Sequence, residues 1–116
     1  MTAQELQQRT KKFSLQIIHF FQALPKSTEA QVLGKQLLRS STSVAANYRA
    51  ACRARSKAEF IAKLSIVVEE ADEVLFWLEM ISESGICKVE ESLVKEGTEI
   101  LFIMSASRRS AKGRNE

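Results

Sequence analysis

SKAEFIAKLSIVVEEADEVLFWLEMISESG, residues 56–85, carries the clearest structural pattern in the chain. Its apolar positions alternate steps of four and three residues, as they do along the packed seam of a helix. These positions are Phe60, Leu64, Val67, Ala71, Val74, Leu78 and Ile81. Ser56 and Glu59 have the spacing of a capping box, and Gly85 is typical of a helix end. The pattern predicts one long helix at about residues 56–84 with one face in a core.

Working outward from this segment, three more amphipathic helices are expected. They lie at about residues 2–24, 28–54 and 88–109. Capping boxes are predicted at Thr2 with Glu5 and at Thr28 with Gln31, and Pro25 stops the first helix. Short connections make neighbouring helices antiparallel. We therefore expect an all-α, up-down-up-down four-helix bundle.

The chain of 116 residues has the size of one domain, with ordinary apolar (45%) and charged (27%) fractions. We place the bundle at residues 1–111 and a basic, flexible tail at residues 112–116. No run of about 18 uncharged apolar residues occurs, and the first residues are polar, so we expect a cytoplasmic protein. Cys52 and Cys87 would lie about 30 Å apart in such a bundle, which favours reduced thiols.

Residues suited to catalysis are scarce. His19 is the only histidine, and its apolar neighbours favour a structural role over that of a general base. The acidic run at residues 69–73 resembles the carboxylates of a di-iron bundle, but such sites need Glu-x-x-His pairs on two helices. We expect no enzyme activity, no cofactor and no metal.

A run of small residues, Ser40–Ser43, lies in the middle of the second expected helix. Low bulk there lets a neighbouring helix approach closely, and the hydroxyls can bond to carbonyls one turn earlier. Arg39 and Asn47 flank the run and would need polar partners if buried. Packing and function both remain open as explanations of these residues.

The apolar residues exceed what one bundle core requires, because several lie beside the expected stripes. We predict that the surplus forms an interface between copies of the chain. The predicted interface residues are Phe21, Phe76, Trp77, Met80, Phe102 and Ile103. The alternative is that they line a broad core or are singly exposed.

Charge is unevenly distributed along the chain. Residues 1–63 hold eleven Lys or Arg and three Asp or Glu, a net charge of +8, whereas residues 64–107 hold two and ten, a net charge of −8. In an antiparallel bundle the basic segments meet at one end, which we call the basic pole. Its predicted nucleic-acid-binding residues are Arg9, Lys12, Arg49, Arg53, Arg55, Lys57, Arg108 and Arg109.

Three roles are open for the basic pole. It could bind phosphates of RNA or DNA, since each cation that neutralises a phosphate releases counterions. It could instead satisfy the negative helix C-termini and keep the protein soluble. It could also attract the acidic surface of another subunit in a head-to-tail ring.

Residues 37–81, LLRSSTSVAANYRAACRARSKAEFIAKLSIVVEEADEVLFWLEMI, resemble the central signature of a known family. The likeness rests on Arg39, Ser43, Asn47, Tyr48, Arg49 and the segment 56–60. The family comprises the four helix bundle proteins related to the 23S rRNA-intervening sequence protein. The first and last helices agree in length and pattern.

The resemblance implies a bundle that assembles as a ring, typically a homopentamer, in the bacterial cytoplasm, without enzyme activity. It also implies RNA or DNA as the leading ligand class and a nucleic-acid-processing protein as a possible partner. The alternative is a protein-interaction scaffold with no nucleic-acid role.

Overall fold

The computed structural model describes residues 1–113 and contains four α-helices and no strand in that range. The helices are α1 (Ala3–Gln22), α2 (Thr28–Ala51), α3 (Lys57–Glu83) and α4 (Glu91–Gly113). The prediction of an all-helical chain with four helices is confirmed.

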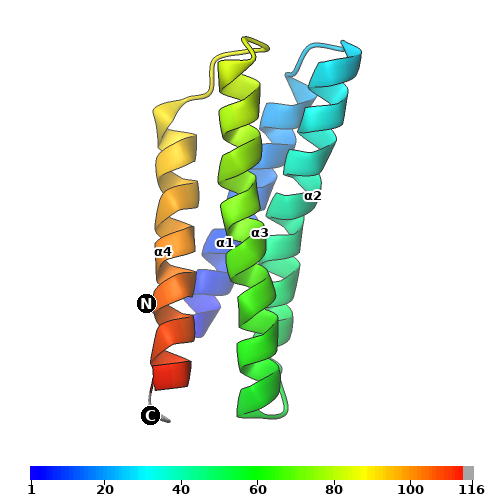
Figure 1. The fold of residues 1–116 in the computed structure, drawn as a ribbon. Coiled ribbons are helices and arrows are strands. Elements are labelled where there is room, and N and C mark those ends of the chain that lie inside the picture. The colour runs from blue at the N-terminus through cyan, green and yellow to red at the C-terminus, as the bar shows by residue number, and fades with distance from the viewer. Residues whose placement is uncertain (114–116) are drawn as a thin grey trace.

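The four helices pack side by side in an elongated body of 48 × 23 × 22 Å. Consecutive helices run in opposite directions in Figure 1, and the α1–α2 and α3–α4 connections lie at the upper end. The α2–α3 connection and the end of α4 lie at the lower end. α3 packs extensively against both α2 and α4, whereas α1 and α4 form the least extensive of the contacting helix pairs.

α3 supplies the centre of the core, as its apolar period predicts. Six seam residues of α3 are buried: Leu64, Val67, Ala71, Val74, Leu78 and Ile81. They pack with buried apolar residues of the other helices, among them Ile17, Leu37 and Met104. The predicted seam is therefore confirmed, although Phe60 at its start is only partly buried.

The helix starts agree with the sequence at two of the three predicted caps. At α1 the Glu5 N–H donates to Thr2 Oγ1 (3.1 Å) and the Thr2 N–H donates to Glu5 Oε1 (2.8 Å), which completes the capping box. At α3 Ser56 is the N-cap, as predicted, and its Oγ accepts from the Glu59 N–H at 3.1 Å. The return bond from the Ser56 N–H to the Glu59 side chain is not formed in the described residues, so the predicted box is only half present there. Past the end of α3, Gly85 takes a φ of +78°, a conformation that glycine adopts without strain.

The cap predicted for α2 is wrong by one residue. Ser27, not Thr28, has the extended backbone of an N-cap, and its hydroxyl accepts from the Ala30 N–H. Thr28 is the first helical residue. The Gln31 side chain donates to the Pro25 carbonyl at 3.0 Å and does not close a box. Two adjacent hydroxyl residues can both serve as caps, so the sequence pattern alone does not distinguish Ser27 from Thr28.

The boundaries of the later helices also differ from the expected ones. α2 ends at Ala51, and the next residues continue as a turn in which the Ala54 N–H donates to the Ala51 carbonyl. α4 begins at Glu91 and extends to Gly113, so residues 112–113 of the predicted tail are helical. Residues 114–116 of that tail lie outside the described residues.

Small side chains let α1 and α2 approach closely. A Cβ added to Gly34 would lie 2.6 Å from a Leu24 methyl carbon and 2.8 Å from the Phe21 ring. Farther along, the Ser14 hydroxyl donates across the interface to the Ser41 carbonyl at 2.8 Å. Ser40 is fully buried and donates to the Gln36 carbonyl at 2.9 Å. For Ser40 and Ser41 the structure therefore supports packing as the explanation.

Candidate nucleic-acid interface

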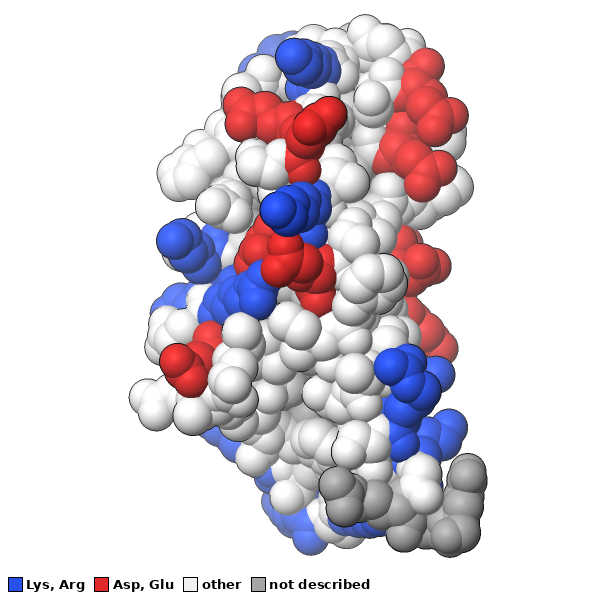
Figure 2. Space-filling model, turned by 90° about the vertical axis from the view of Figure 1, so that its left-hand side faces the viewer, with Lys and Arg blue, Asp and Glu red and all other residues white. Residues whose placement is uncertain are grey.

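The lower end of the bundle brings together basic residues that are far apart in the sequence. It is formed by the start of α1, the end of α2, the α2–α3 connection and the end of α4. In the view of Figure 2, this end carries blue surface and no red surface, while red surface lies in the middle and upper parts. The predicted basic pole is therefore present as a surface of one sign on this face.

Most cations of the pole have no acidic partner within residues 1–113. Arg9 and Arg39 form ion pairs in that range. The unpaired pole residues are Arg49, Arg53, Arg55, Arg108 and Arg109. All are exposed except Arg108, which is partly buried. Their guanidinium groups are thus available to an anion from solution.

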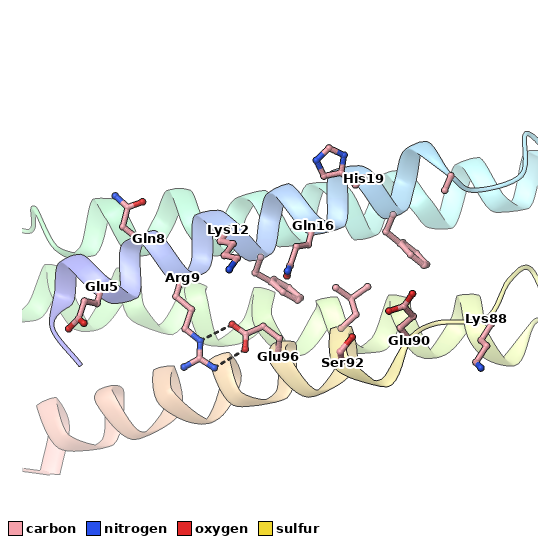
Figure 3. A pocket seen from close by; sticks show the side chains of 14 residues that line it. Glu5, Gln8, Arg9, Lys12, Gln16, His19, Lys88, Glu90, Ser92 and Glu96 are labelled. Atoms are coloured by element: carbon pink, nitrogen blue, oxygen red, sulfur yellow. Dashed lines mark hydrogen bonds and ion pairs between the residues drawn. The ribbon is translucent and has the colours of Figure 1, made fainter.

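Arg9 differs from the other predicted binding residues because it is bound to α4. Its Nε lies 2.7 Å from Glu96 Oε2, and its Nη2 lies 2.8 Å from Glu96 Oε1 and 3.0 Å from Glu99 Oε1 (Figure 3). The bidentate bond to Glu96 is the main cause that raises the pKa of Arg9 above its usual value. The same bond lowers the pKa of Glu96. Arg9 is therefore neutralised within the bundle and is not one of the free cations.

A groove of about 960 Å³ lies between α1 and α4, around this ion pair. Lys12 lines it, and its charge also lowers the pKa of Glu96, so Lys12 shares the acidic surroundings of Arg9. His19 lies at the edge of the groove, and its ring points away from α4 in Figure 3. It is exposed, so it is not part of the buried core of the bundle.

On its other side α1 forms a second groove with α2, of about 530 Å³. Lys11, Arg49 and Arg53 line this groove, so the structure joins two predicted residues to Lys11, which the predicted set omitted. The helical spacing of the sequence could have identified Lys11 as part of a different face from Arg9. Lys11 lies one helical turn from Gln7 and Leu15, on a stripe that excludes Arg9.

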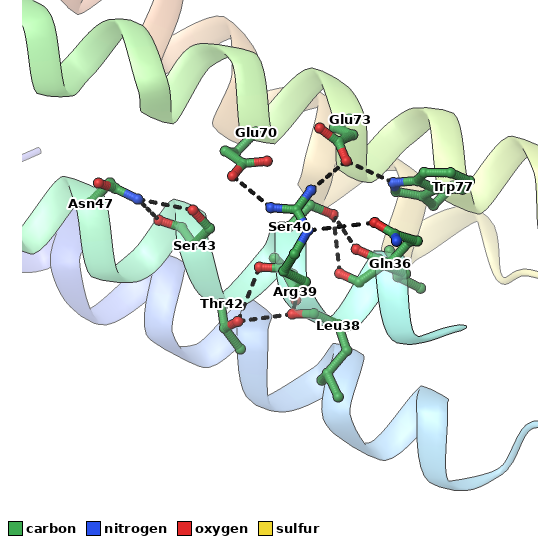
Figure 4. A network of polar contacts seen from close by, with 12 residues as sticks. Gln36, Leu38, Arg39, Ser40, Thr42, Ser43, Asn47, Glu70, Glu73 and Trp77 are labelled. Atoms are coloured by element: carbon green, nitrogen blue, oxygen red, sulfur yellow. Dashed lines mark hydrogen bonds and ion pairs between the residues drawn. The ribbon is translucent and has the colours of Figure 1, made fainter. Parts of the chain in front are cut away.

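Arg39 and Asn47, which the sequence left open, have partners in the structure. Arg39 Nη1 donates to Glu70 Oε2 at 2.9 Å and its Nη2 donates to Glu73, whose Oε1 also accepts from Trp77 Nε1 at 3.1 Å (Figure 4). The Trp77 bond, followed by Arg39, lowers the pKa of Glu73. Asn47 Nδ2 donates to the carbonyl and hydroxyl of Ser43, both at 2.9 Å. The Arg39 network joins α2 to α3.

The predicted interface residues divide into two groups of three. Phe76, Met80 and Phe102 are exposed, with Phe102 the most exposed at 67%. Phe21, Trp77 and Ile103 are partly buried and pack against the core. Phe21 covers Gly34, and Trp77 makes an edge contact with Phe76 at a ring-centroid distance of 4.9 Å. Of the six predicted interface residues, these first three expose large apolar side chains to solvent.

Within residues 1–113, no three His, Cys, Asp or Glu side chains are placed to hold a metal ion. Cys52 and Cys87 are both free thiols. In the same range, no helix is both long and apolar enough to span a membrane.

Together these features define a small four-helix protein with a surface of unpaired cations at one end. The chain belongs to the 23S rRNA-intervening sequence protein family, whose family model matches residues 3–106. A similar solved structure is that of a protein of unknown function from the S23 ribosomal protein family of Bacteroides thetaiotaomicron. The two chains are 32% identical, with a TM-score of 0.86 over 94% of this chain and 99% of the other. No curated protein matches this chain.

Proposed function

We propose that this chain is a non-catalytic bundle that binds RNA or DNA through its basic pole. The observation that carries the proposal is the group of cations at one end that lack acidic partners within residues 1–113. Unpaired Lys and Arg side chains bind phosphates with release of counterions. The family description, which refers to an intervening sequence of 23S rRNA, also favours a nucleic-acid ligand.

Purification at low salt tests the proposal directly. Nucleic acid should co-purify with the protein and should be removed by high salt, because phosphate contacts weaken as salt rises. Sequencing the bound material would identify the ligand. Protein that is free of nucleic acid at low salt, and that binds neither RNA nor DNA when these are added, would contradict the proposal.

We further propose that the up-down-up-down bundle assembles as a ring, most simply a homopentamer. The exposed Phe76, Met80 and Phe102 support an interface, since large exposed apolar side chains are candidates for burial on association. A ring would repeat the basic pole in every subunit, so weak phosphate contacts would combine into stronger binding. Light scattering coupled to gel filtration should report several subunits. A monomer at micromolar concentration would contradict assembly.

A protein-interaction scaffold without a nucleic-acid role is the second candidate, and the same exposed apolar side chains favour it. It predicts an assembled protein with no salt-sensitive affinity for nucleic acid. Under the first proposal, a nucleic-acid-processing protein is a further partner. The two free thiols support a location in the reducing cytoplasm for either candidate.

A further inference from the structure

The groove between α1 and α2 has a lining unlike that of the rest of the charged surface. Its lining residues are Gln7, Gln8, Lys11, Ser14, Leu15, Thr42, Ala45, Ala46, Arg49 and Arg53. Three of these side chains are cationic, none is acidic and none is aromatic. The groove is therefore an electropositive channel within the basic pole.

The three cations are placed on both walls of the groove. Arg49 lies in the last turn of α2, and Arg53 lies in the turn that follows the helix end at Ala51. Lys11 stands on the opposite wall, on α1. None of the three has an ion-pair partner within residues 1–113.

The floor of the groove is small and electrically neutral. Ala45 and Ala46 add little bulk, so a ligand backbone can approach α2 closely. The Thr42 hydroxyl donates to the Leu38 carbonyl at 2.9 Å, and the Ser14 hydroxyl lies within bonding distance of the Thr10 and Ser41 carbonyls, so both protons are already committed. The cations, assisted by the amides of Gln7 and Gln8, are left as the donors toward a ligand.

We propose that the α1–α2 groove holds successive phosphates of one nucleic-acid strand, with the bases directed away from the protein. This inference rests on the proposed function and assigns it to a particular groove and a particular chemical group, the phosphodiester backbone. The groove has no aromatic side chain on which a base could stack, so binding is tolerant of sequence.

The α1–α4 groove is the larger of the two, yet its chemistry does not suit a polyanion. Glu5, Glu90 and Glu96 line it, and Arg9 is already bound to carboxylates. Its three carboxylates balance the charges of Arg9, Lys12 and Lys88, whereas the α1–α2 groove has three cations and no carboxylate, so the α1–α2 groove attracts a phosphate more strongly.

Two triple variants of equal charge change test the groove. The groove variant is Lys11→Gln, Arg49→Gln, Arg53→Gln, and the control is Arg55→Gln, Arg108→Gln, Arg109→Gln, which removes the same charge from the same pole. Binding is measured with a single-stranded RNA and a duplex DNA of equal length and mixed sequence. The groove variant should bind both about tenfold or more weakly, with the slope of log affinity against log salt reduced by about two for the single strand. The control should lose less on both measures.

A second pair of variants leaves every cation in place. Ala46→Glu puts a negative charge on the groove floor, and Ala106→Glu puts the same charge on an exposed position of α4 near the pole. Ala46→Glu should weaken binding severalfold more than Ala106→Glu.

The outcomes separate the two proposals. Equal losses in each matched pair, with wild-type protein binding normally, would overturn the groove and leave nucleic-acid binding by the pole intact. Wild-type protein that binds neither probe would overturn both. Circular dichroism of each variant checks that the bundle remains folded.

Discussion

On one side of α1, Arg9 and Lys12 face the carboxylates of α4. On the other side, Lys11 shares a groove with Arg49 of α2 and with Arg53 of the turn after α2. The three α1 cations are within four positions of one another in the sequence. One side of the helix uses its charge to tie two helices together. The other leaves its charge available to solvent.

The comparison shows that a count of basic residues overstates the charge offered to a ligand. Arg9 contributes to the net charge of the basic segment, yet Glu96 and Glu99 neutralise it. Lys11 contributes the same formal charge and has no such partner within residues 1–113. The direction in which a side chain leaves the helix therefore decides whether its charge is paired within the fold or stays exposed to solvent.

The largest effect on stability should come from the buried face of α1, between its two charged sides. Ile17 is fully buried, so Ile17→Ala should lower the free energy of unfolding by about 2–5 kcal/mol. Leu15, on the side of the α1–α2 groove, is 49% exposed, and Leu15→Ala should change it by less than about 0.5 kcal/mol. Urea denaturation measures both. Similar losses would show that the buried face of α1 is assigned incorrectly.

A smaller effect should separate the two charged sides themselves. Arg9→Gln should cost about 0.5–1 kcal/mol, because it breaks a bidentate but partly exposed ion pair. Lys11→Gln should leave stability almost unchanged. A double-mutant cycle with Glu96→Gln isolates the coupling of Arg9 to Glu96. Zero coupling energy would contradict the role given to the α1–α4 side.

The smallest effect should appear in the dependence of stability on pH. Bonding to Arg9 lowers the pKa of Glu96 from its usual 4.5, so this carboxylate stabilises the fold above that value. Its contribution should be lost as the pH falls below about 4.5 and protonation of Glu96 breaks the pair. Glu96→Gln should therefore flatten the loss of stability with acid relative to the wild type. Identical acid profiles would show that the pair adds nothing to stability.

Much of the fold could be predicted from the sequence because it follows from local patterns. The period of α3 identified its buried residues, since a side chain on that stripe has only the core to face. The cap of α2 was misplaced because Ser27 and Thr28 have the same capping chemistry. The start of α4 was misplaced because Val89 continues the apolar stripe although the helix begins at Glu91.

The site was predictable along the bundle axis but not around it. Antiparallel helices of known length fix which residues reach the lower end, and the basic pole follows. An up-down bundle can turn to the left or to the right, and that choice decides whether a given side of α1 faces α2 or α4. Without it, the sequence could not separate Arg9 from Lys11.

The most direct test of nucleic-acid binding by the basic pole compares two double variants that remove the same charge from opposite ends of the bundle. Arg53→Gln with Arg55→Gln removes two charges from the pole, and Lys26→Gln with Lys35→Gln removes two exposed charges from the opposite end. The first pair should lower the affinity for RNA or DNA and should reduce the salt slope by up to about two, whereas the second should change neither appreciably. Equal losses in the two pairs, or no loss in either, would contradict the account.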